Sequence, residues 1–392
     1  MTKKFNYAVI GAGRQGVATA YDMAKMGDAA SVLLADYDEG VAKRAAERIN
    51  KLLGTDIATS AQIDAGDYDA VVELLGPIDV LLCGTPFIYI LNCTKAAIAT
   101  GTSMVDYGGH TATVMKQLEM SDAAKAKGIS IVPDCGMGPG LNNTMAIYTY
   151  EKLLERGATP REARIWDGGL PQNPPEPWGY QGSFHINGLT NEYYGKALVL
   201  RDGKVTGVDT LTELEMLEFD EFGTLEAFVT SGGSSTAPYT LEGKLQVYEN
   251  KTLRYPGHCA QFKAFKDLGL FEEEPIAGFP GVNPREFYHT LLAPQISVDT
   301  VIDVCIMRAK GVGEKDGKDI SFVVELVDRY DEATGFPAME RLTGWHAAIM
   351  AEFIARGEVE PGTWEMEKAI SSTRFMEEIY KRGFKITEKW EE

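Results

Sequence analysis

The feature that most constrains the fold is a glycine-rich turn, G-x-G-x-x-G, formed by Gly11, Gly13 and Gly16. An apolar run, residues 7–10, precedes the turn, and residues 17–24 repeat apolar side chains at helical spacing after it. In such a strand–turn–helix unit the first glycine permits a tight turn, and the second lets a pyrophosphate approach the backbone. The third allows the helix to pack closely on the strand. The turn therefore predicts a Rossmann-type dinucleotide-binding domain.

An acidic residue after the second β-rich run indicates which dinucleotide is bound. Residues 31–35 form that run, and Asp36 follows it, 20 residues after Gly16. A carboxylate at this position accepts a hydrogen bond from the ribose 2′-hydroxyl of NAD and repels the 2′-phosphate of NADP. Lys43 and Arg44 lie too far along the next helix to hold that phosphate. The sequence predicts NAD as the cofactor.

Further cofactor contacts are expected around this turn. Arg14 and Gln15 begin the helix beside the phosphates, and Asp64 is expected near the adenine. Ligands of parallel sheets bind at the carboxyl ends of the strands, so the segments after the fourth and fifth runs are expected under the nicotinamide half. Those segments contribute Gly84, Thr85, Pro86, Asp106, Tyr107 and Gly108. The alternative for both segments is an ordinary turn without a ligand.

The N-terminal third alternates short β-rich runs with helical patterns, which is typical of an α/β fold with a doubly wound parallel sheet. The runs are residues 7–10, 31–35, 57–63, 79–83, 103–106 and 129–132. Farther on, Asp-Gly pairs at 202–203 and 316–317 predict β-hairpins in an α+β domain with an antiparallel or mixed sheet. After Gly344 the pattern is helical up to Gly357. The predicted domains are 1–157, 158–335 and 336–392.

Charge and cysteine content exclude several classes of protein. The formal net charge of −19 repels nucleic-acid backbones and anionic lipid, so neither is expected as a partner. Five scattered cysteines without a C-x-x-C pair indicate reduced thiols and a cytoplasmic location. No His, Cys or Asp cluster has the spacing of metal ligands, so no metal is expected.

An ordered series of motifs runs through the chain, namely residues 132–143 (VPDCGMGPGLNN), 167–171 (DGGLP), 225–228 (LEAF), 251–258 (KTLRYPGH) and 343–349 (TGWHAAI). In these motifs the chain resembles the saccharopine dehydrogenase-like family. The proline-rich loop after Gly-Gly-Leu-Pro, the pair Glu192-Tyr193 and the hairpin at 311–330 make the resemblance closer to lysine 6-dehydrogenases. The resemblance implies a second domain inserted into the dinucleotide-binding domain, with C-terminal helices that return to it. It also implies a homodimer formed through the sheet of the second domain.

The resemblance implies a function in amino-acid metabolism. Lysine 6-dehydrogenases use NAD to oxidise the terminal amine of L-lysine to a semialdehyde, which cyclises. Saccharopine dehydrogenases and carboxynorspermidine dehydrogenases share the same fold and are the alternative. A second alternative, of another class, is a protein that binds NAD without catalysis. The favoured prediction is an NAD-dependent oxidoreductase that transfers hydride from an amino-acid amine.

Amine oxidation needs a neutral amine, because the ammonium form of a lysine side chain predominates at pH 7. We favour His258 as the base, since imidazole titrates near that pH, with Glu192 and Tyr193 holding the ammonium or assisting proton transfer. Arg254 is expected to bind the substrate carboxylate with its two-pronged donor geometry. Ser234, Ser235 and Thr236 are expected to assist substrate binding. The alternative for each residue is a purely structural role.

Overall fold

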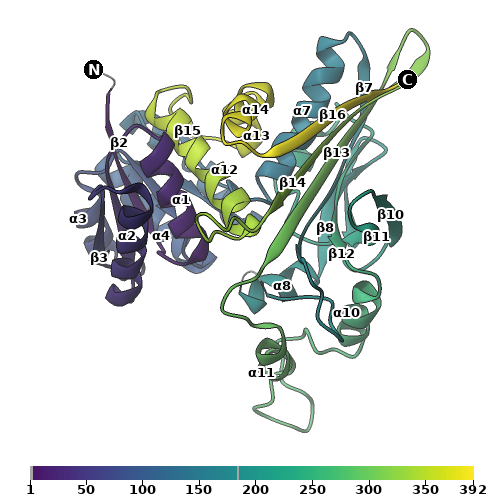
Figure 1. The fold of residues 1–392 in the computed structure, drawn as a ribbon, viewed down its shortest axis with the longest axis horizontal. Coiled ribbons are helices and arrows are strands. Elements are labelled where there is room, and N and C mark those ends of the chain that lie inside the picture. Colours follow the sequence, from purple (N-terminus) through teal and green to yellow (C-terminus); the bar gives the residue numbers. More distant parts are fainter. Residues whose placement is uncertain (1–2, 183–184) are drawn as a thin grey trace. The chain divides into compact units, whose positions relative to one another are not determined.

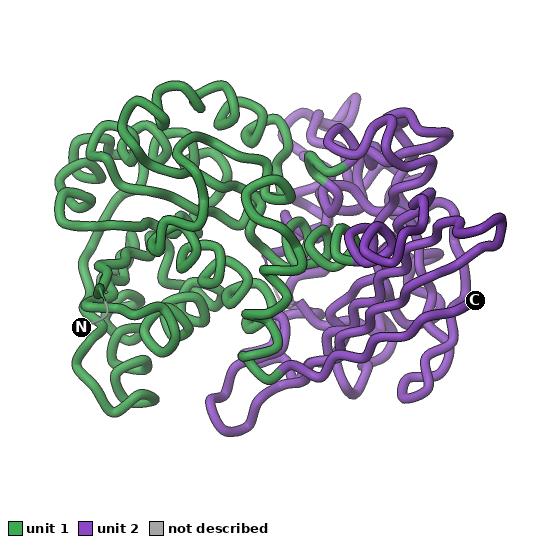
Figure 2. The backbone as a smooth tube through the Cα atoms, turned by 90° about the horizontal axis from the view of Figure 1, so that it is seen from above, with its two compact units in different colours: residues 1–148, 235–237, 340–383 green, residues 149–234, 238–339, 384–392 purple. Residues whose placement is uncertain are grey.

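The computed structural model describes residues 3–182 and 185–392, which divide into two compact units. The first unit holds the N-terminal residues up to 148, then 235–237 and 340–383, and the second holds 149–234, 238–339 and 384–392 (Figure 2). The second unit is therefore an insertion, and the three residues 235–237 inside it belong to the first unit. The boundaries between the two units fall within helices α7 (Leu141–Glu155) and α12 (Ala338–Ala355).

The first unit is built on a seven-stranded sheet in which every described pair is parallel, with the order β15-β6-β5-β4-β1-β2-β3 (Figure 1). All six predicted runs are strands, within two residues of their expected bounds. The strands are β1 Phe5–Ile10, β2 Ala29–Asp36, β3 Ala58–Gln62, β4 Val80–Cys83, β5 Ser103–Asp106, β6 Ser130–Val132 and β15 Gly362–Thr363. The predicted parallel sheet is confirmed.

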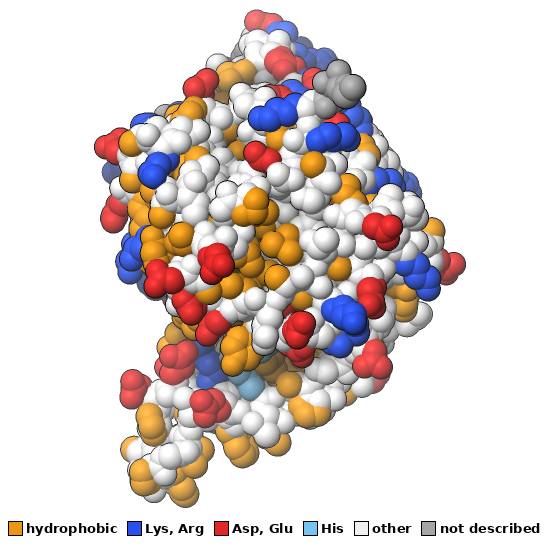
Figure 3. All heavy atoms as spheres, turned by 90° about the vertical axis from the view of Figure 1, so that its left-hand side faces the viewer, with side chains coloured by type: hydrophobic (Ala, Val, Ile, Leu, Met, Phe, Trp, Pro, Cys, Tyr) orange, Lys and Arg blue, Asp and Glu red, His pale blue; other side chains and the backbone are white. Residues whose placement is uncertain are grey.

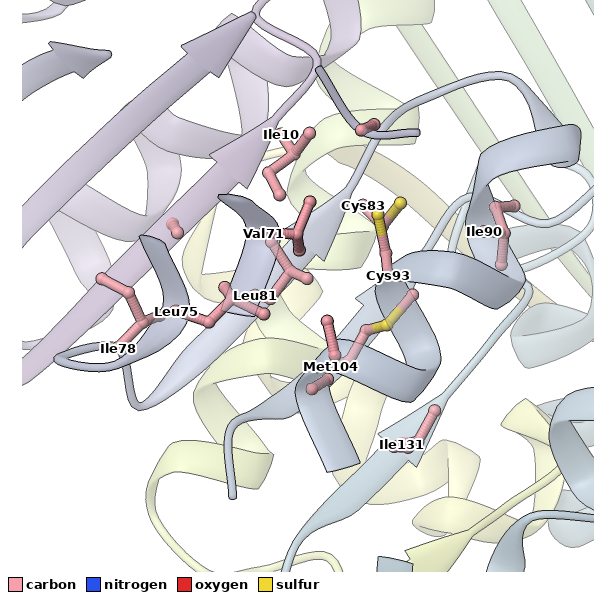
Figure 4. Close-up of a cluster of buried hydrophobic side chains, with 14 of the residues drawn as sticks. Ile10, Val71, Leu75, Ile78, Leu81, Cys83, Ile90, Cys93, Met104 and Ile131 are labelled. Atoms are coloured by element: carbon pink, nitrogen blue, oxygen red, sulfur yellow. The ribbon is translucent and has the colours of Figure 1, made fainter. Parts of the chain in front are cut away.

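Helices connect these strands because a parallel pair needs a crossover of a dozen or more residues. They are α1 Arg14–Met26, α2 Glu39–Leu53, α3 Tyr68–Leu75, α4 Phe87–Thr100, α5 Thr111–Leu118 and α6 Ser121–Lys127. Two more helices of this unit, α13 Met366–Ala369 and α14 Ser372–Lys381, follow β15. One core lies between the sheet and helices α3 and α4 (Figure 4). There Val71 and Leu75 of α3 pack with Leu81 of β4, and Cys93 of α4 lies beside Cys83.

Helix α12 begins earlier than the sequence pattern predicts. The apolar spacing predicts a helix after Gly344, whereas the helix starts at Ala338. The cause is a distant cap: the Asp303 carboxylate accepts hydrogen bonds from the backbone N–H groups of Ala338 at 2.7 Å and Met339 at 2.9 Å. A carboxylate at this place satisfies two of the N–H groups that a helix start leaves free. Because the cap comes from a residue 35 positions away, no local pattern reveals it.

The second unit contains a nine-stranded mixed sheet, as predicted. The strands are β7 Thr159–Pro171, β8 Lys196–Arg201, β9 Lys204–Asp209, β10 Glu215–Phe219, β11 Gly223–Val229, β12 Val247–Arg254, β13 Asp303–Lys315, β14 Lys318–Arg329 and β16 Lys385–Glu391. Both predicted hairpins are present, as β8–β9 and β13–β14. The C-terminal segment differs from its expected helices, because residues 385–391 form β16 and pair with β14.

The helices between these strands position the residues of interest. They are α8 Ile186–Glu192, α9 Ala237–Leu241, α10 His258–Asp267 and α11 Pro284–Ile296. Aromatic side chains, among them Tyr193, Phe228 and Phe262, form a buried cluster there. None of the helices in the described part of the chain is long and apolar enough to cross a membrane. Figure 3 shows acidic and basic side chains interspersed over one face of the protein.

Candidate functional site

The glycine-rich turn has the close contacts that its sequence predicts. Gly11 has a φ of +100°, and a Cβ on it would lie 2.6 Å from the carbonyl oxygen of Gly84. A Cβ on Gly16 would lie 2.0 Å from the carbonyl oxygen of Gly11. Any side chain at either position would therefore displace backbone. Gly84 also donates its N–H to the Ile10 carbonyl at 2.7 Å, which holds the loop after β4 against the turn.

The start of helix α1 fits the phosphates of a dinucleotide. Gly13 is the N-cap, and no side chain caps the helix there. A Cβ on Gly13 would meet nothing within 4 Å, so the space in front of this backbone is open. Exposed Arg14 and half-buried Gln15 are the first two residues of the helix. Free N–H groups and open space at a helix start suit an anion.

Asp36 lies at the end of β2, beside the glycine turn. One carboxylate oxygen accepts from the Ala12 N–H at 2.9 Å, and the other accepts from the Asp38 N–H at 3.0 Å. Arg44 lies nearer than its place in the sequence suggests. A terminal nitrogen of its guanidinium is 3.0 Å from where a Cβ on Gly40 would stand, so the side chain folds back over the first turn of α2. The Asp36 carboxylate thus lies at the glycine turn, and the Arg44 guanidinium brings a positive charge towards the first turn of α2.

Replacing Asp36 with alanine is expected to weaken NADH binding and strengthen NADPH binding, each by about tenfold or more. The physical reason is the loss of a hydrogen-bond acceptor for the 2′-hydroxyl and of about 1–4 kcal/mol of repulsion between a carboxylate and a phosphate near 4 Å. Fluorescence titration with both reduced cofactors measures the two dissociation constants. Equal affinities of the wild-type protein for NADH and NADPH would contradict the predicted preference. Arg44→Ala is the companion variant, and we expect it to affect NADPH alone.

The loops after β4 and β5 come together, although Asp106 has a different role from the predicted one. Its carboxylate is fully buried and accepts from Gln117 Nε2 at 2.8 Å and from the Gly108 N–H at 2.8 Å. Burial raises the pKa of Asp106 to about 6. Because both oxygens have partners within the protein, Asp106 shapes the loop and does not face a cofactor. Tyr107 instead packs beneath Gly84, where a Cβ would lie 3.1 Å from the tyrosine ring.

The remaining predicted contacts of the first unit lie in three places. Thr85 and Pro86 lead from β4 into α4, and the Thr85 hydroxyl contacts Cys83 Sγ at 3.2 Å. Asp64 follows the edge strand β3 and accepts from the Gly66 N–H at 2.8 Å, which is a turn contact. A Cβ built on Gly108 would collide with Asp134. Gly108 therefore brings two loops into direct contact.

Two of the three hydroxyl residues predicted to assist substrate binding belong to the first unit. Ser235 donates to the buried Asp134 carboxylate at 2.5 Å, and Thr236 donates to Glu367 at 3.1 Å. Burial raises the pKa of Asp134 to about 8. Ser234 is assigned to the second unit and is also buried. The hydrogen bonds of Ser235 and Thr236 are therefore with acids of the dinucleotide-binding unit rather than with Arg254.

The second unit brings four predicted residues into one cluster. Glu192 ends α8 and Tyr193 follows it, Arg254 ends β12, and His258 begins α10. Arg254 donates its Nε–H to the Tyr193 hydroxyl at 3.0 Å, and its terminal nitrogen lies 3.6 Å from the Glu192 carboxylate. The Tyr193 hydroxyl lies 2.9 Å from His258 Nε2. The four were predicted to act on one substrate, but the contacts between them were not evident from the sequence, where they are up to 66 positions apart.

His258 does not have the titration expected of a base at neutral pH. Its side chain is buried, and its Nδ1 lies 3.3 Å from the Trp178 carbonyl oxygen, which can only accept. Nδ1 therefore carries the proton, and Nε2 accepts from the Tyr193 hydroxyl. Burial and the nearby Arg254 charge hold the pKa of His258 well below its usual value. Neutral His258 instead fixes Tyr193, which in turn orients Arg254.

Glu192 is the partly exposed acid of the cluster. Removal of water from its surroundings raises the pKa of Glu192 to about 7, and the Arg254 charge partly opposes this rise. Its side chain is still 31% exposed, whereas Tyr193 and Arg254 are almost fully buried. A reachable carboxylate with this pKa can accept a proton at working pH.

Sequence reasoning missed two acids and an amide that support this cluster. Asp167 accepts a hydrogen bond from Asn250, and burial raises its pKa to about 6. Glu226 accepts from the N–H groups of Gly257, at 2.9 Å, and of Cys259, which fixes the start of α10. Asp167 and Glu226 both lie in motifs that carry the family resemblance, and their place in these motifs could have identified them from the sequence.

Comparison with known families identifies the chain. Residues 7–132 match the saccharopine dehydrogenase NADP binding domain, and residues 136–384 match the saccharopine dehydrogenase C-terminal domain. The chain belongs to the saccharopine dehydrogenase family. The first match covers the glycine turn and both cofactor loops, and the second covers the cluster around Arg254. The family resemblance noted in the sequence is therefore confirmed, and the N-terminal domain is of a type that binds a nicotinamide nucleotide.

Individual relatives agree with this assignment. Saccharopine dehydrogenase [NADP(+), L-glutamate-forming] of Pyricularia oryzae is 27% identical over 244 residues, which are 60% of this chain and 53% of that protein. Mitochondrial alpha-aminoadipic semialdehyde synthase of Rattus norvegicus is 26% identical over 223 residues, 55% of this chain and 23% of that protein. The chain thus aligns with about half or less of these curated relatives.

A solved structure shows the same fold. Apo saccharopine dehydrogenase (L-Glu forming) from Saccharomyces cerevisiae superposes with a TM-score of 0.80 and covers 99% of this chain and 100% of that one, at 19% identity. At 19% identity the match shows a shared fold and nothing about function. It confirms the Rossmann-type domain with an inserted mixed-sheet domain.

Proposed function

We propose that the protein oxidises the terminal amine of an amino acid, with L-lysine as the substrate and NAD as the hydride acceptor. The observation that carries the proposal is the pair of Glu192 and Arg254, whose opposite charges lie 3.6 Å apart on a partly exposed carboxylate and a buried guanidinium. Such a pair can bind a carboxylate at the guanidinium and take a proton from an ammonium group at the carboxylate, and L-lysine has both kinds of group. Arg254 would bind the carboxylate, and Glu192 would act on the ammonium.

The residues of the cluster suggest how the reaction proceeds. When bound, the nicotinamide nucleotide supplies the hydride acceptor. Glu192 takes a proton from the substrate ammonium, because only the neutral amine can lose hydride from the adjacent carbon. Arg254 holds the carboxylate, and the hydrogen-bonded series Tyr193, His258 and Trp178 keeps its guanidinium in place. The imine that remains reacts with water to release ammonia and the semialdehyde.

A second candidate is a saccharopine dehydrogenase-type reaction, in which a secondary amine is oxidised or formed. The names of the relatives favour it. Saccharopine has more carboxylates than lysine, and each would call for a cationic partner. Within the part of the chain that the structure describes, the hydrogen bonds and ion pairs of the cluster include one cation, Arg254. A single cation supports L-lysine, which has one carboxylate, over saccharopine.

The test is a substrate panel with each cofactor. Purified protein is incubated with NAD or NADP and with L-lysine, saccharopine, L-ornithine or a diamine, and reduced nicotinamide is followed by absorbance. We expect reduction of NAD with L-lysine and none with saccharopine. An Arg254→Lys variant should raise KM for L-lysine at least tenfold, because one ammonium cannot replace the two-pronged guanidinium.

Each other outcome points to a different function. Turnover of saccharopine but not L-lysine would establish the second candidate. Reduction of NADP in preference to NAD would overturn the cofactor assignment while leaving the amine chemistry in place. Binding of cofactor without turnover of any amine would favour the third candidate, a protein that binds the nucleotide without catalysis.

A further inference from the structure

Two aromatic rings stack on each other in the first unit, and neither is buried. The ring centroids of Phe87 and His110 are 4.3 Å apart, and their planes differ by 13°. Phe87 is 42% exposed, and its neighbour Ile88 is 65% exposed. An exposed stacked pair next to an exposed aliphatic residue leaves apolar area in contact with water, which is typical of a surface that a ligand covers.

The pair lies at the edge of the sheet where a dinucleotide is expected. Phe87 is the first residue of α4, after the loop that follows β4, and His110 is the N-cap of α5, after the loop that follows β5. β4 and β5 are parallel neighbours, so both loops leave the sheet at its carboxyl edge. In such sheets ligands bind beyond this edge, at the point where the strand order reverses.

The strand order also tells which half of the dinucleotide meets the pair. β1 carries the phosphate turn and lies between β2 and β4. Asp36, expected to bind the adenosine ribose, ends β2 on one side of the turn. Gly84, which contacts Gly11 directly, begins the β4 loop on the other side. A dinucleotide that crosses the turn therefore extends its nicotinamide half over the β4 and β5 loops.

Contacts with Thr113 determine which nitrogen of the neutral His110 ring carries the proton. Its Nδ1 accepts the Thr113 backbone N–H at 3.3 Å and lies 2.8 Å from the Thr113 hydroxyl. Because Nδ1 is the acceptor, the proton of the neutral ring is on Nε2, at the opposite side of the ring. The stacked pair thus combines a fixed apolar surface with one free N–H donor.

We infer that Phe87 and His110 form the platform on which the nicotinamide ring is positioned. Phe87 contributes apolar ring surface, and His110 contributes ring surface and a donor for the carboxamide of the nicotinamide. The inference rests on nucleotide binding by this family and not on the identity of the amine substrate. It makes Phe87 and His110 positioning residues for the cofactor.

The experiment compares a ligand that has the nicotinamide with one that lacks it. The dissociation constants of NADH and of ADP-ribose are measured by calorimetry for the wild-type protein and for Phe87→Leu and His110→Asn. The asparagine keeps an N-cap for α5. We expect each variant to weaken NADH binding about three- to tenfold, in line with an aromatic contact, and to leave ADP-ribose binding unchanged.

Tyr68→Leu is the matched control, because Tyr68 is the first residue of α3 and is 40% exposed, much as Phe87 is the first residue of α4. It should change neither constant. Equal weakening of both ligands by Phe87→Leu and His110→Asn, or no effect on either, would overturn the platform. If the wild-type protein bound neither ligand, nucleotide binding itself would be refuted and the platform with it.

Discussion

Glu192→Gln is expected to lower kcat for amine oxidation about 10²- to 10⁴-fold and to leave the dissociation constant of NADH unchanged. The amide has the shape of the carboxylate but cannot take a proton from the substrate ammonium. General base catalysis by one side chain contributes rate factors of about this size. Steady-state kinetics and a separate cofactor titration measure the two quantities. A loss of less than tenfold would mean that Glu192 is not the base.

The pH dependence of kcat/KM provides a second and independent readout of the same residue. The carboxylate form of Glu192 increases as the pH rises through its pKa of about 7, and the substrate ammonium that gives up its proton predominates up to its own pKa of about 10.4. For the wild-type protein we therefore expect log(kcat/KM) to rise with a slope of one below pH 7 and to be level between pH 7 and about pH 10. Glu192→Gln should rise with a slope of one throughout this range, because only the free amine can then react. An unchanged break near pH 7 in the variant would assign that titration to another group.

Glu272→Gln is the control for the loss of a negative charge. Glu272 lies on the surface of the same unit and accepts a hydrogen bond from Tyr194. We expect its kinetics to match those of the wild-type protein at every pH. A similar loss of rate in Glu272→Gln would show that the reduced negative charge of the unit, rather than proton transfer, explains the effect at Glu192.

Arg382→Leu is expected to lower the free energy of unfolding of the protein by about 3–5 kcal/mol. Arg382 is buried in the first unit and binds Asp22 at 2.7 Å and Glu352 at 2.5 Å, and it also lies 3.4 Å from Glu378. It links α14 to α1 and α12. The leucine would leave the buried Asp22 without its ion-pair partner and Glu352 with Arg356 at 3.6 Å, and such a loss is strongly unfavourable. Urea unfolding followed by circular dichroism measures the change.

The decrease in the free energy of unfolding caused by Arg382→Leu should be larger at pH 8 than at pH 5. Burial raises the pKa of Asp22, and it raises that of Glu352 to about 8 even with Arg382 present. A carboxyl with a raised pKa in the folded state favours folding below its unfolded pKa, and this contribution is lost as the pH rises through the folded pKa. Lys368→Leu, which removes a surface ion pair with Glu365, should change stability by less than about 1 kcal/mol. A pH-independent loss in Arg382→Leu would contradict this explanation.

Several features could be predicted from the sequence because neighbouring residues determine them. The alternation of apolar runs with helical patterns predicted six strands of the parallel sheet. Gly11 and Gly16 were recognisable because a tight turn and close packing exclude a side chain at those positions. The Asp-Gly pairs predicted two hairpins, since that dipeptide readily adopts the backbone angles of the turn. The ordered motifs also predicted the family.

Other features depended on residues far apart in the chain. Helix α12 starts at Ala338 because Asp303 caps it, and β16 forms because β14 offers an open edge. Residues 235–237 belong to the first unit, where Ser235 bonds to Asp134. None of these pairings has a local pattern.

The chemistry of the cluster was also decided by tertiary structure. Residue type made His258 the favoured base, yet burial and Arg254 hold its pKa low, while similar surroundings raise the pKa of Glu192 to about 7. A pKa reflects the free energy of a charge in its full environment, which sums over the water removed and all nearby charges. The sequence by itself determined the strands, the turns and the types of residue available. Only the tertiary structure decided which of those residues are buried, which are paired and which can exchange a proton.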